Sequence, residues 1–148
     1  MSKLQKALLA RLLLFAAIWL SGCSFFSPPI DISGVWEGEI EWTAYGIRSP
    51  ITLDLVHEDR DLSGTVTLVG PGSTPFELEI DDGHARISSL SLEASGVFQA
   101  GTTQNVTIEL EGSFLESQMS GTGRQVVNGT VYELTWEAVL VTPAVPEE

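Results

Sequence analysis

The sequence predicts an all-β domain, an antiparallel up-and-down meander barrel of about eight to ten strands. Three observations predict it. Apolar and polar residues alternate with period two from residue 34 to residue 141. The same stretch shows no helical period. Glycine, asparagine, aspartate and serine separate the alternating runs by short connections, so sequence neighbours should pair antiparallel. A β-sandwich fits the same pattern and is the alternative.

The first half of the domain is predicted to form four strands, each with one apolar and one polar face. The expected ranges are 34–44, 50–58, 62–69 and 76–81. Polar residues at 58–61 and a Gly-Pro-Gly break at 70–72 separate the middle strands, and Asp82-Gly83 is expected to form a hairpin turn. The apolar face is expected to carry Trp36, Ile40, Trp42, Ile51, Leu53, Leu55, Leu62, Gly64, Val66, Leu68, Phe76, Leu78 and Ile80.

The phase of the apolar residues changes in the middle of the chain. Ala85 and Ile87 have odd numbers and Leu90 has an even one, so a bulge or a turn is expected at Ser88-Ser89. Alternation then returns in further strands, and Asn128-Gly129 favours a type I′ turn because both positions tolerate a positive φ. These later strands are expected to include 106–114, 119–127 and 130–141.

A short internal repeat supports two similar halves. Ile51-Thr-Leu-Asp-Leu and Leu62-Ser-Gly-Thr resemble Val106-Thr-Ile-Glu-Leu and Met119-Ser-Gly-Thr, at offsets of 55 and 57 residues. Gly64 and Gly121 fall on the apolar faces of their strands, where a glycine permits sharp coiling or close packing. A chance similarity between strand segments is the alternative.

The charge balance argues against nucleic-acid binding. The chain has 20 acidic and 7 basic residues, a net charge of −13, and beyond residue 22 only four arginines stand against all 20 carboxylates, a net of −16. Neutralising phosphates needs clustered lysine and arginine, and so does binding anionic lipid through a folded surface. The single cysteine excludes an intramolecular disulfide and a cysteine-rich zinc or iron–sulfur site.

The N-terminus has the layout of a secretory signal peptide. Three basic residues within the first eleven precede a nine-residue apolar run at 12–20, which is shorter than the roughly 20 residues that span a bilayer. The run ends in Leu20-Ser21-Gly22-Cys23, which resembles the lipobox of bacterial lipoproteins. An ordinary signal peptide with an incidental cysteine is the alternative.

The lipobox resemblance implies lipid attachment to the Cys23 thiol, cleavage before Cys23 and acylation of the new amine. Several acyl chains give stable membrane anchoring where one would be marginal. Ser24, in place of an aspartate, implies export to the outer membrane. Residues 1–22 are then the signal peptide, 23–33 the lipidated cysteine with its tether, 34–141 the barrel and 142–148 a frayed tail.

The alternating pattern could also belong to a membrane barrel, with its apolar face toward lipid and its carboxylates in the lumen. Twenty carboxylates would then have only four arginines as partners, and unpaired buried charges are costly. The C-terminus ends in proline and glutamate instead of an apolar aromatic strand. We therefore expect the apolar face inside and the Glu/Asp/Thr face in water.

Gly34-Val35-Trp36 at the start of the first strand resembles the Gly-x-Trp of lipocalins and of streptavidin-like barrels, and Leu62-Ser63-Gly64-Thr65 resembles a hairpin of the latter group. The resemblance implies a small barrel that binds a small hydrophobic or amphipathic ligand. In lipocalins this tryptophan closes one barrel end and an arginine from a late strand packs over it. Arg124, the only late-strand arginine here, departs from that pattern, because it is expected to face outward on the penultimate strand. Candidate ligand contacts are the inward-facing Trp36, Trp42, Leu53, Tyr132 and Trp136, which could instead fill the core.

No motif of an enzyme is present in the sequence. His57 and His84 are the only histidines, and both are expected near hairpin ends, where polar residues collect. Glu37, Glu39 and Glu41 form an acidic stripe that Asp54, Glu77 and Glu79 could extend toward a calcium site, although a solvated face is the better explanation because the sequence has no calcium-loop motif.

These observations lead to one expected function and one alternative. We expect a non-enzymatic, lipid-anchored outer-membrane lipoprotein whose partners are the membrane and a small apolar ligand, with no metal and no cofactor besides the lipid on Cys23. The alternative is a barrel with a filled core that acts structurally, or through protein contacts, in the cell envelope.

Overall fold

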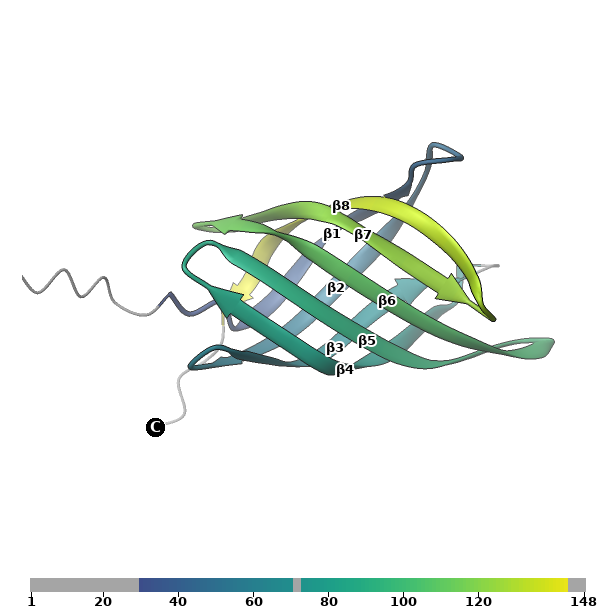
Figure 1. Ribbon diagram of the computed structural model, residues 1–148, viewed down its shortest axis with the longest axis horizontal. Coiled ribbons are helices and arrows are strands. Elements are labelled where there is room, and N and C mark those ends of the chain that lie inside the picture. The colour runs from purple at the N-terminus through teal and green to yellow at the C-terminus, as the bar shows by residue number, and fades with distance from the viewer. Residues whose placement is uncertain (1–29, 71–72, 144–148) are drawn as a thin grey trace, which may run out of the picture.

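The computed structural model describes residues 30–70 and 73–143, which form one closed antiparallel barrel of eight strands (Figure 1). This confirms the predicted up-and-down barrel and removes the sandwich alternative. The strands are β1 (Gly34–Trp42), β2 (Ile47–Glu58), β3 (Asp61–Val69), β4 (Pro75–Arg86), β5 (Ser89–Ala100), β6 (Thr102–Leu115), β7 (Gln118–Val127) and β8 (Thr130–Pro143). The lipobox and Cys23 lie outside the described residues.

Each strand pairs with its neighbours in sequence, and β1 closes the barrel by pairing with β8 as well as β2. Asn128 and Gly129, with φ of 48° and 85°, make the expected turn between β7 and β8. Within the described residues, no helix is long and apolar enough to cross a membrane.

The prediction of a hairpin turn at Asp82-Gly83 was wrong. Strand β4 continues through these residues to Arg86, and its pairing with β5 shifts register between Ile80 and Asp82. This irregularity moves the inward face from even-numbered to odd-numbered residues, so Ala85 is buried. The β4–β5 turn is formed by Ile87 and Ser88, one residue before the expected position.

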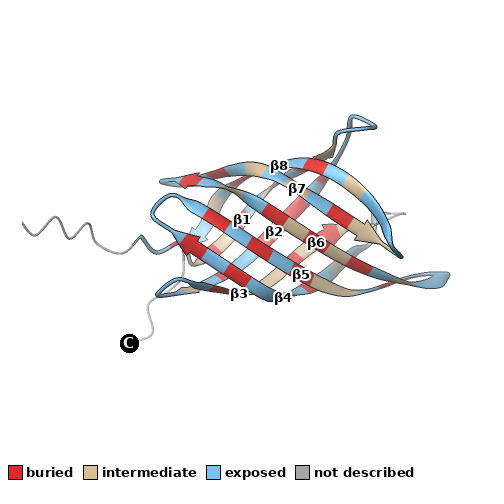
Figure 2. Cartoon of the chain, viewed as in Figure 1, coloured by how far each residue is buried: buried red, intermediate tan, exposed pale blue. Residues whose placement is uncertain are grey.

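Buried and exposed residues alternate along the strands (Figure 2), and the buried ones are apolar, so the apolar face of the sheet points into the barrel, as expected. A barrel of eight strands has an interior that side chains can fill. Here 23 buried apolar residues form one core. The carboxylates lie on the outer, solvent-facing side, so none of the described ones is among the buried residues.

Two glycines bring strands into close contact on opposite sides of the barrel. Gly64 on β3 and Gly121 on β7 occupy matching places in the two hairpins of the sequence repeat. A Cβ at Gly64 would collide with the carbonyl oxygen of Asp54, and one at Gly121 with that of Glu111. These contacts agree with the predicted role of both glycines in close packing.

A short segment closes one end of the barrel. We call residues 30–33 the strap. The end of the barrel that the strap covers is called the closed end, and it also carries the turns β2–β3, β4–β5 and β6–β7. Ile32 is buried, and its carbonyl oxygen accepts a hydrogen bond of 2.9 Å from Trp36 Nε1. The His57 backbone N–H donates to Ser33 Oγ at 2.8 Å, and the Ile32 N–H points to His57 Nδ1 at 3.4 Å. The strap therefore fixes the place where the chain enters the barrel.

Candidate functional site

The opposite end of the barrel, which we call the open end, holds a cavity of about 780 Å³. We call it the mouth cavity. Its walls are mostly aromatic and aliphatic, its polar groups are uncharged apart from one arginine, and none of the described residues that line it carries a carboxylate. The lining residues are Trp42, Tyr45, Ile47, Arg48, Ser49, Pro50, Val69, Gly70, Ser73, Phe76, Phe98, Gln104, Val106, Gln125, Val127 and Tyr132.

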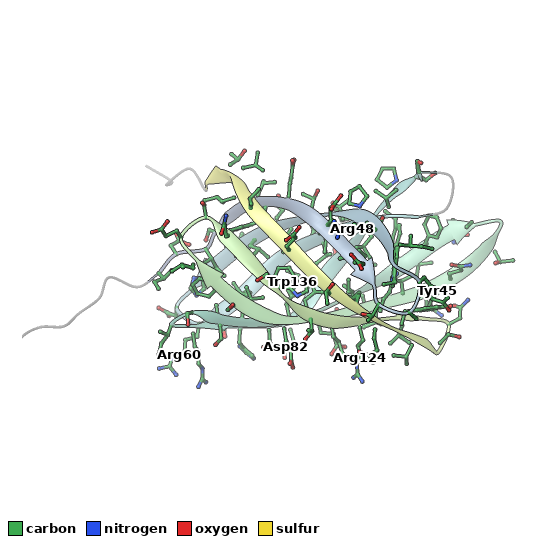
Figure 3. The ribbon with its side chains drawn as sticks, turned by 90° about the horizontal axis from the view of Figure 1, so that it is seen from above. Tyr45, Arg48, Arg60, Asp82, Arg124 and Trp136 are labelled. Carbon is green, nitrogen blue, oxygen red and sulfur yellow. The ribbon has the colours of Figure 1, made fainter. Side chains whose placement is uncertain are left out.

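Two aromatic pairs shape the mouth cavity. The rings of Phe76 on β4 and Phe98 on β5 lie 4.6 Å apart, centroid to centroid, with planes inclined at 35°. Tyr45, in the β1–β2 turn, lies 6.4 Å from Tyr132 on β8. Figure 3 places Tyr45 and Arg60 near opposite ends of the barrel. Aromatic side chains offer large apolar area, and the tyrosines add hydroxyl groups at the rim.

Two uncharged polar side chains lie deeper, at the boundary between the cavity and the core. Gln125 is 7% exposed, and its Oε1 accepts a hydrogen bond of 2.9 Å from Trp42 Nε1. The hydrogen bonds seen among the described residues use only this oxygen of Gln125, which leaves the amide nitrogen to donate to a guest molecule. Ser49 makes one long contact, 3.4 Å from Oγ to the Val69 carbonyl oxygen. The cavity therefore combines apolar walls with hydrogen-bond donors.

Arg48 is the cation at the rim. Its Nε donates to Glu41 Oε2 at 2.8 Å, and its Nη1 lies 3.6 Å from Glu39 Oε2. The hydrogen bond with Glu41, followed by the charges of Glu41 and Glu39, raises the pKa of Arg48 above its ordinary value. The guanidinium is well exposed, so these pairs stabilise the fold little. Arg48 is therefore a permanent positive charge at the rim that is paired with the carboxylates of Glu41 and Glu39.

The five predicted ligand contacts divide between two places. Trp42 and Tyr132 line the mouth cavity. Trp36, Leu53 and Trp136 are 1%, 0% and 3% exposed and belong to the core. Trp136 Nε1 is satisfied by the backbone, at 3.2 Å from the carbonyl oxygens of both Glu111 and Thr122.

Sequence reasoning missed the contribution of Phe76, Phe98 and Gln125 to the mouth cavity. The phenylalanines come from strands whose register contains a shift, so their meeting could not be read from the sequence. Gln125 did carry a signal, because it is a polar residue in the inward-facing row of β7 that also holds Met119. A lone amide in an apolar row needs a partner, and here Trp42 supplies one.

A polar trough of about 820 Å³ crosses the outer face over β4 to β7. Serines and glycines hollow it, and His84 lies on its wall. His84 lies on β4, two residues before the strand ends at Arg86, and so near a hairpin end as expected, with Nδ1 3.2 Å from Asp61 Oδ1 and Nε2 3.2 Å from Asp82 Oδ1. All three side chains are exposed, and the trough shows no nucleophile bonded to this histidine among the described contacts.

The acidic stripe is spread across the sheet. Glu37 faces Thr52 on β2, and Thr67 on β3 faces Glu77 on β4, so threonines separate these carboxylates. Among residues 30–70 and 73–143, no three histidine, cysteine or acidic side chains come together as they would around a metal ion.

Arg124 faces outward on β7, as expected. Its Nε and Nη2 donate to the two carboxylate oxygens of Glu109 at 2.7 and 2.8 Å. Trp36 at the closed end is instead covered by the strap, since its indole nitrogen bonds to Ile32. The chain matches no protein-family model, and no curated protein is similar to it in sequence.

Proposed function

We propose that the protein is a lipid-anchored lipoprotein of the bacterial cell envelope whose barrel binds a small amphipathic ligand at its open end, without catalysis. The observation that carries the binding proposal is the mouth cavity, an apolar space of about 780 Å³ whose described lining residues include no carboxylate, in a chain of net charge −13. Pockets for small ligands usually have volumes of about 300–1,000 Å³ and apolar walls with few polar groups. Against the acidic outer surface, this lining is a local exception, because Arg48 is the only charged side chain among the described lining residues.

The lining also indicates which kind of ligand fits. Phe76, Phe98 and Val106 provide apolar contact for an acyl chain or a ring system. The Gln125 amide nitrogen and the guanidinium of Arg48 are donors, so the polar end of the ligand should accept hydrogen bonds, as a carboxylate or carbonyl does. An amphipathic molecule with an acceptor head group matches both features.

The anchoring part of the proposal rests on the sequence alone. Leu20-Ser21-Gly22-Cys23 supports lipidation of Cys23, and Ser24 supports an outer-membrane location. The test is the distribution of the protein between membrane and soluble fractions of the producing cell. Wild type should stay with the outer membrane and Cys23→Ser should not. Membrane retention of Cys23→Ser would contradict lipidation.

The binding test uses the Cys23→Ser chain, which lacks the acylation site. A fluorescent apolar anion such as anilinonaphthalene sulfonate should bind with enhanced emission, and palmitate should displace it. Replacing Gln125 with leucine keeps the volume but removes the donor, so palmitate affinity should fall about tenfold. Gln118→Leu, on the outer face at the closed end, is the matched control. Equal affinities of the two variants would exclude Gln125 as a ligand contact, and no displacement at all would contradict the proposed ligand class.

A second candidate function is supported by the filled core. Trp36, Leu53 and Trp136 occupy the barrel below the mouth, so a long ligand has no room to pass deeper. A barrel of this kind could act through its acidic outer surface in envelope assembly. Native mass spectrometry of the purified chain after exposure to a lipid extract separates the two functions. A retained small molecule supports ligand binding, whereas a bare protein mass supports the structural role.

A further inference from the structure

Two apolar side chains at the closed end stand out by their exposure. Ile87, in the β4–β5 turn, is 87% exposed, and Leu115, where β6 enters its turn, is 76% exposed. The other large apolar side chains that the structure describes as exposed reach at most 64%. Isolated surface apolar residues are common, but two adjacent ones at turn tips, where polar residues are the rule, call for a physical reason.

The backbone of Ile87 adds a second, independent cost. Its φ is +52°, in the left-handed region, where the branched Cβ of isoleucine is crowded. Asparagine, aspartate or glycine would relieve the strain and would also prefer water. A residue that is unfavourable both in conformation and in exposure points to a functional role for this side chain.

The two apolar tips lie side by side. The Phe114 N–H donates a hydrogen bond of 2.9 Å to the carbonyl oxygen of Ser88, which joins the β6–β7 hairpin to the β4–β5 turn. Leu115 on β6 pairs across the sheet with Gln118 on β7, and Gln118 in turn pairs with the half-exposed Val139 on β8. Ile87, Leu115 and Val139 together form what we call the docking surface.

The docking surface lies at the end of the barrel where the chain enters. The strap begins at Ile30, and Figure 1 shows the turns β4–β5 and β6–β7 at the same end. Only seven residue steps separate Ile30 from Cys23, a reach of about 25 Å even when fully extended. If Cys23 carries the lipid, as proposed above, the closed end stays close to the bilayer.

We propose that the docking surface rests on a zwitterionic lipid bilayer, with Ile87 and Leu115 inserted into the interfacial region. This inference rests on the proposed lipid anchor. Glu58, Asp59 and Glu116 lie in or beside the neighbouring turns, where they attract the ammonium groups of choline or ethanolamine head groups and repel anionic lipid. In this orientation the mouth cavity opens away from the membrane, toward the aqueous phase.

The experiment uses the lipidated full-length protein on phosphatidylcholine–phosphatidylethanolamine vesicles. The only native cysteine is Cys23, and the proposed lipid is attached to its thiol, so an introduced cysteine is the single free thiol. Ile87→Cys and Leu115→Cys, each labelled with a nitrobenzoxadiazole dye, should show a blue-shifted emission and quenching by lipids that carry a quencher in the chain region. Thr102→Cys, exposed at the open end, is the matched control and should show neither effect.

The outcomes separate this inference from the proposed anchor. Vesicle-bound protein without a blue shift at residues 87 and 115 overturns the docking surface and leaves the anchor intact. Equal shifts at all three positions also overturn it, because the barrel would then have no preferred orientation. Wild-type protein that does not sediment with vesicles overturns both proposals.

A second variant distinguishes docking from a structural role of the isoleucine. Ile87→Asn should raise the urea midpoint of unfolding, because asparagine accepts a positive φ and exposure to water. The same change should reduce quenching of the dye at Leu115→Cys at least twofold. A lowered midpoint together with unchanged quenching would show that Ile87 serves the fold and not the membrane.

Discussion

Trp36 Nε1 donates a hydrogen bond of 2.9 Å to the carbonyl oxygen of Ile32, a residue that lies outside the strands and is nevertheless buried. The indole thus holds the strap across the closed end while the strap shields the indole from water. Trp36 and Ile32 therefore both fill the core and close this end of the barrel.

The first prediction concerns this closure. Ile32→Ala should lower the free energy of unfolding by about 2 kcal/mol, because a buried isoleucine loses its apolar contacts and leaves a space at the barrel end. Ile30→Ala, two residues earlier and half-exposed, is the control and should change it by less than about 0.5 kcal/mol. Urea unfolding followed by tryptophan fluorescence measures both, and similar values would show that the strap does not hold the closed end.

The second prediction concerns pH. Ser33 donates to Asp31 Oδ1 at 2.8 Å, and its hydrogen bonds are the main cause that lowers the pKa of Asp31 below its ordinary value of 3.8. A carboxyl group whose pKa is lower in the folded state stabilises the fold above its unfolded-state pKa, and this stabilisation is lost as the pH falls through the folded-state pKa.

Asp31→Asn keeps an acceptor for the Ser33 N–H but removes the charge. We expect wild type to be slightly more stable than Asp31→Asn at neutral pH, because the carboxylate is exposed and its contribution is screened. The difference should shrink below pH 3.8 and vanish once Asp31 is protonated in the folded state. A difference that persists in acid would assign the effect to something other than the charge.

The third prediction concerns the close approach at Gly121. Gly121→Ala should destabilise the barrel by about 2–3 kcal/mol, because the new Cβ would collide with the backbone of Glu111 and of Gly112. Ser120→Ala, one residue earlier and outward-facing, should be nearly neutral. Comparing the urea midpoints of the two variants tests whether position 121 requires glycine because the neighbouring backbone is so close, and not because of the strand propensity of alanine. A tolerated Gly121→Ala would contradict the close contact.

The fourth prediction concerns Arg124. Its two hydrogen bonds with Glu109 raise the pKa of its guanidinium, yet the pair is exposed to solvent. Arg124→Gln should therefore leave the unfolding midpoint unchanged within error, in low and in high salt alike. A large loss of stability would show that the Arg124–Glu109 pair holds β6 and β7 together.

The inward face of the barrel could be predicted because burial imposes a strict period of two. Leu53, Val66 and Leu78 were all placed correctly by alternation alone. The turn between β4 and β5 could not be placed by local chemistry. Asp82-Gly83 is a strong turn signal, but the phase difference between Ala85 and Leu90 located the real turn more closely.

The candidate site was predictable only in part. Trp42 and Tyr132 could be assigned to the inward face, but whether an inward residue meets core or cavity depends on its height in the barrel. That height follows from the register of all eight strands, which includes shifts that the sequence does not mark. Ile87 was expected to continue an apolar strand face, and only the structure shows it at an exposed tip.

The strap has a mechanical consequence. It joins β1 directly, so a force applied through the N-terminus is carried first by the Ile32–Trp36 contact and only then by the strand itself. Strand β1 is held by hydrogen bonds on both sides, to β2 and to β8. A pulling force on this terminus therefore detaches the strap from Trp36 before it separates β1 from its neighbours, and the eight-stranded barrel stays closed around its core.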